Sequence, residues 1–114
     1  MKDLVTIGLP SKGRLKEKSI SFFNDSGLKI IHSEKERNYF GTIVNKPNVK
    51  IIFLHAKEII QRLGDGTLDI GISGLDLLKE LDINLQRKIN IQKKLDYGNA
   101  NLVIAVPDLS LIHI

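Results

Sequence analysis

A strand–helix–strand pattern in the middle of the chain constrains its fold more than any other feature. One apolar run, VKIIFL, begins at Val49, and a second, LDIGI, ends at Ile72. Between them, AKEIIQRLG places apolar residues at i, i+3, i+4 and i+7, namely Ala56, Ile59, Ile60 and Leu63. Gly64 is the predicted end of this helix. Two strands joined by one helix form a βαβ unit, which is expected to be right-handed with parallel strands, so we predict a parallel sheet.

The N-terminal part of the chain shows the same alternation of strand and helix. Leu4–Leu9 is short and apolar and stops at Pro10, which predicts a buried strand. A helix should follow, with Ser11 as its N-cap and Gly27 as its C-terminal stop. Its apolar residues fall on one face: Leu15, Ile20, Phe22 and Phe23. Leu28–Ile31 predicts a second strand, and the polar stretch after it predicts a loop leading to a short hairpin through YFGTIV.

The C-terminal part completes an α/β pattern. A third helix is predicted from Leu75 to about Leu81, followed by an alternating stretch, KINIQKKLDY, and an apolar strand, NLVIAV, that Pro107 ends. The fold class is therefore α/β, with helices between largely parallel strands. Ligands of such sheets bind at the carboxyl ends of the strands. Two loops take that position here, PSKGRL and GISGLD.

The loop PSKGRL has the parts of an anion-binding turn. The start of a helix offers unpaired N–H groups and a partial positive charge. Gly13 would let the backbone approach a phosphate closely, Lys12 supplies a point charge, and Arg14 supplies a bidentate fork. The alternative is that both cations are solvated and that Gly13 only shapes the turn.

The loop GISGLD follows the same logic on a different strand. Gly71 and Gly74 would leave room for a flat ligand against the backbone, Ser73 can donate a hydrogen bond, and Asp76 can accept one from a ribose hydroxyl or an amino group. The alternative for Asp76 is that a carboxylate in the first turn of a helix favours the helix dipole without any ligand. Neither loop matches the Walker A or dinucleotide spacing.

Composition excludes several other classes of protein. A chain of 114 residues fits one domain, and without cysteine it has no disulfide, thiolate metal site or cysteine nucleophile. Seventeen basic and thirteen acidic residues give a net charge of +4, which suits a small acidic ligand and falls short of a nucleic-acid binder. No apolar run is long enough for a membrane span or a signal peptide, so we expect a soluble cytoplasmic protein. The histidines are dispersed and no GxSxG turn is present, which argues against a zinc site or a serine nucleophile.

Four stretches taken in order resemble the first domain of ATP phosphoribosyltransferase, the first enzyme of histidine biosynthesis. They are LPSKGRL, RNYF, GDGTLDIGISGLDLL and LDYGNANLVIAVP. The resemblance implies one lobe of a periplasmic-binding-protein-like type II fold, with a mostly parallel sheet. It divides the chain into a first lobe at 1–96, a strand at 97–107 that crosses toward a second lobe, and a tail of doubtful origin at 108–114.

The same resemblance implies a reaction and a set of residues. In this pentosyltransferase family, adenine N1 of ATP displaces pyrophosphate from C1 of phosphoribosyl pyrophosphate, with Mg²⁺ held mainly by the substrate phosphates. Lys12, Gly13 and Arg14 match the basic loop that faces the substrate cleft. Arg37 matches an arginine that reaches the leaving pyrophosphate, although by base rates it would be a solvated surface charge. The nucleotide side is matched by the glycine loop, with Gly71, Ser73, Gly74 and Asp76.

The chain also departs from the family pattern. The family binds the ribose 5-phosphate and its pyrophosphate in the second lobe, through an Asp-rich strand and a Ser/Thr-Gly-x-Thr loop, which this chain lacks. We therefore expect a fragment that is catalytically inactive alone. The parent enzyme is expected to be a homo-oligomer. Its first lobe favours the short form, which in the family works with a regulatory subunit resembling histidyl-tRNA synthetase.

Two readings from other classes compete with this one. The first is a non-catalytic module of the same fold that binds a small anion or a nucleotide, and the second is a plain interaction domain with incidental loops. Protection of the chain by nucleotide in a thermal-shift titration would argue against the second.

Overall fold

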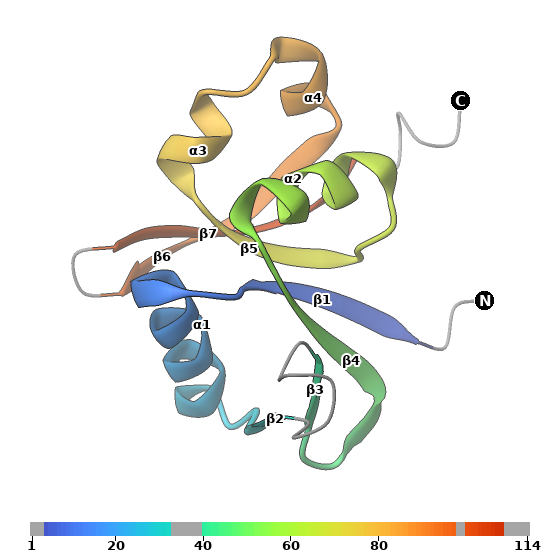
Figure 1. Ribbon diagram of the computed structural model, residues 1–114, viewed down its shortest axis with the longest axis vertical. Coiled ribbons are helices and arrows are strands. Elements are labelled where there is room, and N and C mark those ends of the chain that lie inside the picture. The colour runs from blue at the N-terminus through green and yellow to red at the C-terminus, as the bar shows by residue number, and fades with distance from the viewer. Residues whose placement is uncertain (1–3, 33–39, 98–99, 109–114) are drawn as a thin grey trace.

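The computed structural model describes residues 4–32, 40–97 and 100–108, and these form one mixed sheet covered by helices on both faces (Figure 1). The described strands pair in the order β2-β3-β4-β1-β5-β7-β6. They are β1 (Val5–Pro10), β2 (Ile30–His32), β3 (Phe40–Ile43), β4 (Lys46–Leu54), β5 (Ile70–Gly74), β6 (Ile89–Tyr97) and β7 (Ala100–Pro107). The described helices are α1 (Gly13–Asp25), α2 (Ala56–Asp65), α3 (Leu75–Lys79) and α4 (Ile83–Arg87).

The parallel part of the sheet is confined to its centre. β1 pairs in parallel with β4 on one side and with β5 on the other, as the βαβ pattern predicted. The pairings of β2 with β3, β3 with β4, β5 with β7 and β6 with β7 are antiparallel. The expectation of a mostly parallel sheet therefore holds for β4, β1 and β5, and the sheet as a whole is mixed. Among the antiparallel pairs, β3 and β4 are joined by residues 44 and 45 in a tight hairpin.

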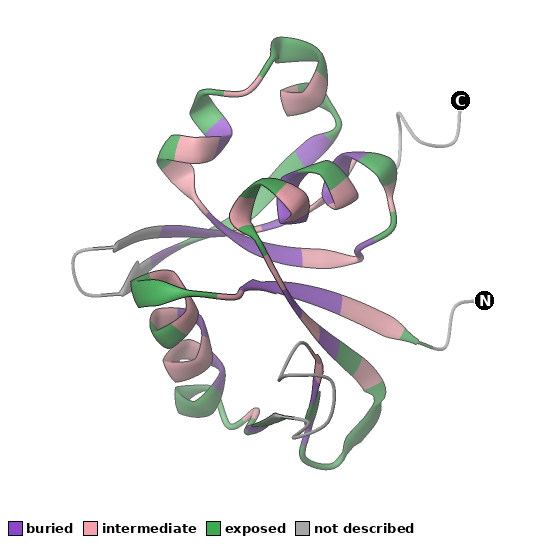
Figure 2. Ribbon diagram, viewed as in Figure 1, coloured by how far each residue is buried: buried purple, intermediate pink, exposed green. Residues whose placement is uncertain are grey.

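Each face of the sheet has its own apolar core. On one face, Phe23 of α1 packs with Leu9 and Ile72 in a cluster of buried residues to which all seven described strands contribute. On the other face, α2 and α3 cover a second cluster that includes Leu68 and Val103. Figure 2 shows the buried stretches along the central strands and on the inner sides of the helices. The α/β class predicted from the sequence is confirmed.

Helix α1 has the apolar face that its sequence predicts, but it begins one residue later than expected. Phe23 is buried, and Leu15, Ile20 and Phe22 pack around the same core. The predicted N-cap, Ser11, is wrong, because Lys12 occupies the cap position and its side chain makes no capping bond. The Ser11 N–H donates instead to the carbonyl of Leu54, 2.9 Å away, at the end of the neighbouring strand.

The C-terminal stop of α1 is confirmed at Gly27, which adopts φ = +84°. The N–H of Leu28 donates to the carbonyl of Phe23 at 2.8 Å, which closes the last turn. The strand predicted at Leu28–Ile31 begins two residues later, as β2. The hairpin predicted through YFGTIV forms between β3 and β4, and Asn45 occupies its turn with φ = +66°.

Helix α2 runs past its predicted end at Gly64 and stops at Gly66. Gly66 adopts φ = +79°, and the N–H of Thr67 donates to the carbonyl of Arg62 at 2.9 Å. Gly64 lies inside the helix because α4 packs there: a Cβ at Gly64 would lie 2.5 Å from Leu85 Cδ1. The short helix α4 was not predicted, so this role of Gly64 was missed.

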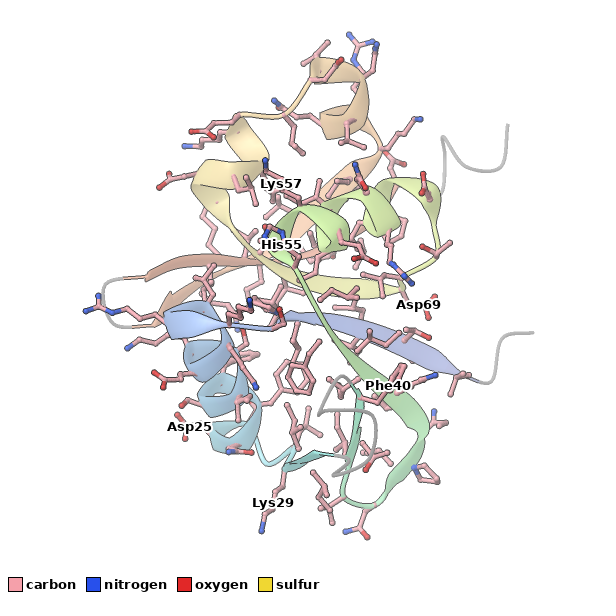
Figure 3. All side chains as sticks on the ribbon, viewed as in Figure 1. Asp25, Lys29, Phe40, His55, Lys57 and Asp69 are labelled. Carbon is pink, nitrogen blue, oxygen red and sulfur yellow. The ribbon has the colours of Figure 1, made fainter. Side chains whose placement is uncertain are left out.

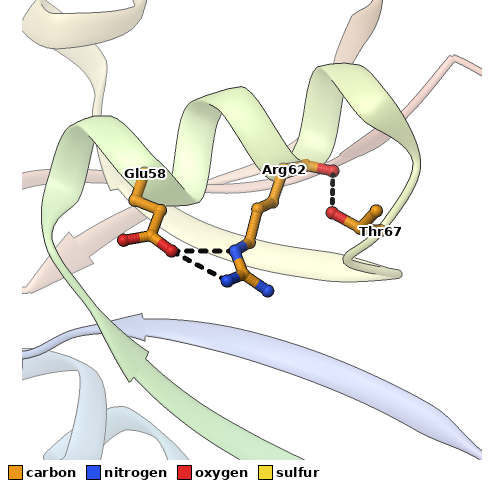
Figure 4. A network of polar contacts seen from close by, with 3 residues as sticks. All are labelled: Glu58, Arg62 and Thr67. Atoms are coloured by element: carbon orange, nitrogen blue, oxygen red, sulfur yellow. Dashed lines mark hydrogen bonds and ion pairs between the residues drawn. The ribbon is translucent and has the colours of Figure 1, made fainter.

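The last turns of α2 carry a small polar network (Figure 4). Arg62 donates to one carboxylate oxygen of Glu58 from Nε at 3.0 Å and from Nη2 at 2.8 Å, and the Thr67 hydroxyl donates to the Arg62 carbonyl at 3.3 Å. The side chains of Arg62 and Glu58 are 40% and 45% exposed, so the i, i+4 pair contributes only about 0.3–0.5 kcal/mol. The fold of α2 depends mainly on its buried face.

A reciprocal pair of bonds joins the entry to β5 to the start of β1. The Thr6 N–H donates to Asp69 Oδ2 at 2.8 Å, and the Asp69 N–H donates to the Thr6 carbonyl at 2.9 Å. These bonds lie next to the parallel pairing of β1 with β5, in which Ile7 pairs with Ile70 and Gly8 with Gly71. Asp69 therefore helps to fix the register between β1 and β5.

Residues 100–107 belong to this sheet, because β7 lies between β5 and β6. The crossing toward a second lobe, expected for 97–107, remains a prediction, and residues 109–114 of the expected tail lie outside the described part of the chain. Within the described ranges, no helix combines the length and the apolar character needed to cross a bilayer.

Candidate functional site

The carboxyl ends of the three central strands meet at one edge of the sheet. Pro10, the last residue of β1, is level with Leu54, the last residue of β4. Gly8 pairs with Gly71, so the same register, continued by two residues, places Pro10 level with Ser73 near the end of β5. The loops PSKGRL and GISGLD therefore leave the sheet at the same edge, as predicted.

The two loops leave the sheet in opposite directions. After β1 the chain enters α1, which packs on one face, and after β5 it enters α3, which packs on the face that also carries α2 (Figure 1). In open α/β sheets, ligands bind outside the carboxyl ends of strands at such a switch point. The space between the ends of β1 and β5 is therefore our candidate site.

The basic loop presents its cations at this edge. Lys12, Gly13 and Arg14 are all exposed, and neither cationic side chain makes a hydrogen bond or an ion pair with another described residue. Gly13 adopts φ = +73°, a conformation that favours glycine, and a Cβ added there would meet nothing within 4 Å. The loop is open to an anion, and the turn itself also requires the glycine.

The other loop presents Gly74 and Asp76 at the same edge. Gly74 caps α3 with φ = −73°, and the space around its missing Cβ is empty to 4 Å. Asp76 is exposed in the first turn of α3. These two residues are accessible to a ligand as expected, and Asp76 also has the position that favours the helix dipole.

Gly71 and Ser73 lie in the core rather than on the surface. A Cβ at Gly71 would lie 2.9 Å from both Ile59 Cγ2 and Leu63 Cδ1, so the absent side chain admits helix α2. Ser73 is 0% exposed, and its hydroxyl donates to the carbonyl of Gly74 at 3.3 Å. Their contact with a ligand remains a prediction, and the packing of α2 accounts for Gly71 without one.

Two further polar residues lie at the same edge. His55 directly follows β4, and its Nδ1 accepts a hydrogen bond from the Lys57 N–H at 3.3 Å, which caps α2 (Figure 3). Both side chains are exposed. The sequence reasoning treated the histidines only as dispersed, although the place of His55 after a predicted strand could have revealed it. Arg37, the predicted catalytic residue, lies outside the described residues.

The described residues contain no group of three or more His, Cys, Asp or Glu side chains that could hold a metal ion. Among the predicted site residues, Asp76 is the one carboxylate, beside three cations, three glycines and a serine. This donor set fits an anionic ligand better than a protein-held divalent cation, which needs several oxygen ligands.

An open cationic loop across a switch point from a glycine loop is an arrangement with which α/β domains bind phosphate-bearing and other anionic ligands. The comparisons specify the class further. The ATP phosphoribosyltransferase (HisG) family model matches residues 55–113. The ATP phosphoribosyltransferases of Brucella melitensis and Brucella ovis are each 38% identical over 105 residues, which is 92% of this chain. The chain belongs to the ATP phosphoribosyltransferase family.

The fold agrees with that assignment. In the ATP phosphoribosyl transferase (HisG:HisZ) complex from Thermotoga maritima, one chain matches 81% of this chain with a TM-score of 0.56 at 19% identity. The match covers 40% of that neighbour, and the chain spans about half the length, 46%, of the curated Brucella relatives. The family and the α/β fold are therefore shown for a region that is shorter than its relatives.

Proposed function

We propose that this chain provides the first α/β lobe of an ATP phosphoribosyltransferase that works in the first step of histidine biosynthesis. The observation that carries the proposal is the juxtaposition of the basic loop and the glycine loop at one switch point, in a chain of this family. The finer architecture that we propose is one lobe of a periplasmic-binding-protein-like type II fold, with the second lobe supplied by further chain. We place the enzyme in the cytoplasm.

The proposed reaction joins adenine N1 of ATP to C1 of phosphoribosyl pyrophosphate. The nitrogen lone pair forms the new N–C bond while the C–O bond to pyrophosphate breaks, and the bonding electrons leave with the pyrophosphate. A displacement of this kind needs no protein nucleophile. It needs two polyanions held in line and the charge of the leaving group neutralised. The exposed Lys12 and Arg14 and the free N–H groups at the start of α1 suit that task.

We propose a role for the predicted site residues, with that of Arg37 taken from the family resemblance alone. Arg14 would grip a phosphate with its bidentate fork, and Lys12 would add a point charge. Gly74 would admit the flat base, and Asp76 would accept a hydrogen bond from it or from the ribose. Arg37 would neutralise the leaving pyrophosphate. Because the described residues offer no cluster of metal ligands, Mg²⁺ would arrive on the substrate phosphates, where it supplies additional charge neutralisation.

The proposed partners come from the relatives. The Thermotoga maritima neighbour is a HisG:HisZ complex. By analogy, we propose that the whole enzyme is the short form, a homo-oligomer that works with a regulatory subunit resembling histidyl-tRNA synthetase.

Replacing Arg14 by alanine is expected to weaken ATP binding by the 114-residue chain about tenfold, because one charge-assisted bidentate contact is lost. Isothermal titration calorimetry at low salt measures the change. Lys29→Ala is the matched control, since Lys29 is an exposed cation beyond the opposite end of α1. Equal affinities of wild type and Arg14→Ala would mean that the basic loop is a solvated turn.

The 114-residue chain alone is expected to release no pyrophosphate from ATP and phosphoribosyl pyrophosphate, because the proposed second wall of the site lies in further chain. Joining residues 1–107 to the remaining half of the Brucella melitensis relative should restore turnover, and Arg14→Ala in that chimera should reduce it. A coupled pyrophosphate assay measures both. Robust turnover by the short chain would contradict the two-lobe site. A folded, ATP-binding chimera without turnover would favour the non-catalytic nucleotide-binding module.

A further inference from the structure

A pocket of about 200 Å³ lies between α3, α4 and β6, apart from the residues of the candidate site. Its apolar wall includes Leu78, Ile89 and Ile91, and its polar rim consists of Lys79, Gln86 and Lys94. Leu78 and Ile89 are buried at 5% and 8% exposure, whereas Ile91 remains 45% exposed. The pocket is therefore an apolar hollow with one side open to solvent.

The charged residues at the rim of this pocket are both lysines. Lys79 and Lys94 are exposed, and neither side chain makes an ion pair or a hydrogen bond with another described residue. No carboxylate is among the residues that line the pocket, and the nearby Glu80 lines a different hollow between α2, α3 and α4. Two cations with no neutralising partner beside an apolar wall are suited to an amphipathic anion.

The polar residue between the two lysines holds the pocket in shape. Gln86 Nε2 donates to the carbonyl of Leu81 at 2.7 Å and approaches that of Lys79 at 3.3 Å. These bonds tie α4 to the last residue of α3 and to the turn that follows it, so the two helices that wall the pocket are fixed relative to each other. Because the pocket is already formed, its side chains and helices need not be ordered when a ligand binds, and the affinity is not reduced by that entropic cost.

We propose that this pocket binds a small carboxylate with an apolar body, of the size of an arylacetate. The apolar body would lie against Leu78, Ile89 and Ile91, and the carboxylate would lie between Lys79 and Lys94. An apolar cavity of 150 Å³ holds a benzene ring, so the volume here admits a ring with a short acidic side chain. A zwitterion of the same size is disfavoured, because its ammonium group would face two lysines.

The test uses phenylacetate and the 114-residue chain, followed by two-dimensional NMR of the backbone amides. Saturable shifts are expected in α3, α4 and β6, and the neutral isostere phenylacetamide should bind about fivefold more weakly or not at all. Lys94→Met, which keeps the apolar stem, should weaken phenylacetate binding by a similar factor. Lys93→Met is the matched control, because the neighbouring Lys93 is also exposed but does not line the pocket.

A further variant tests the apolar wall. Ile91→Ser should weaken phenylacetate binding several-fold without unfolding the protein, because Ile91 is 45% exposed. The proposal is overturned if phenylacetate causes no saturable shift, if phenylacetamide binds as tightly, or if Lys93→Met and Lys94→Met change the affinity equally.

Discussion

Replacing Ile59 by alanine is expected to lower the free energy of unfolding by about 2–5 kcal/mol. Ile59 is 0% exposed, and its side chain lies between helix α2 and the two central strands. Its Cγ2 is 2.9 Å from the position that a Cβ would take at Gly71, and its Cγ1 is 3.6 Å from the equivalent position at Gly8. The substitution would leave a cavity that the rigid sheet cannot fill.

Urea unfolding followed by circular dichroism measures this effect. A single domain is stable by only about 5–15 kcal/mol, so the loss would shift the midpoint strongly. Gln61→Ala is the control, because Gln61 is an exposed residue of the same helix and should change stability by less than about 0.5 kcal/mol. Equal midpoints for Ile59→Ala and Gln61→Ala would show that α2 does not pack on the sheet as described.

Replacing Gly71 by alanine is expected to lower the free energy of unfolding by about 1–3 kcal/mol, through overpacking. The added methyl group would lie 2.9 Å from Ile59 and Leu63, and both of those side chains are fully buried. Gly74→Ala is the matched control on the same strand, since its methyl group would enter empty space at φ = −73°. The control should leave stability nearly unchanged, and thermal unfolding compares the two variants.

The variants at the two glycines also distinguish an effect on core packing from an effect on nucleotide binding. If Gly74 admits the nucleotide, Gly74→Ala weakens ATP binding while the protein stays stable, and Gly71→Ala destabilises the protein whether or not ATP is present. Combining Gly71→Ala with Ile59→Ala should cost less than the sum of the single changes, because the cavity of one receives the methyl group of the other. Additive changes would contradict the contact between Ile59 and Gly71.

The elements that could be predicted from the sequence are those with a long, regular apolar period. The face of α1, the apolar positions of α2 and the central βαβ unit have this property. The structure confirms the face of α1, the parallel strands, and three of the four α2 positions, Ile59, Ile60 and Leu63. Helix α4 has only five residues, too few for a helical period to be visible. Because α4 could not be predicted, the sequence indicates Gly64 as the end of α2. The structure shows instead that the absence of a side chain at Gly64 makes room for Leu85 of α4.

The position of the candidate site could also be predicted in part from the sequence. The carboxyl ends of parallel strands meet, so the two loops could be brought together from the chain order alone. Which glycine of GISGLD faces the solvent could not be predicted, because a strand alternates its faces and only the packing of α2 distinguishes Gly71 from Gly74. Ser73 is likewise fully buried, which could not be predicted from the sequence.

The central place of β1 has a consequence for how the protein is made. During synthesis this strand leaves the ribosome before both of its partners, β4 and β5, which come from residues 46–74. It therefore stays without its full set of partners until β5 has followed. Contacts between residues so distant in sequence slow folding, and a waiting strand is prone to pair with other chains. The yield of folded protein should therefore depend on chaperones and on a low temperature during synthesis.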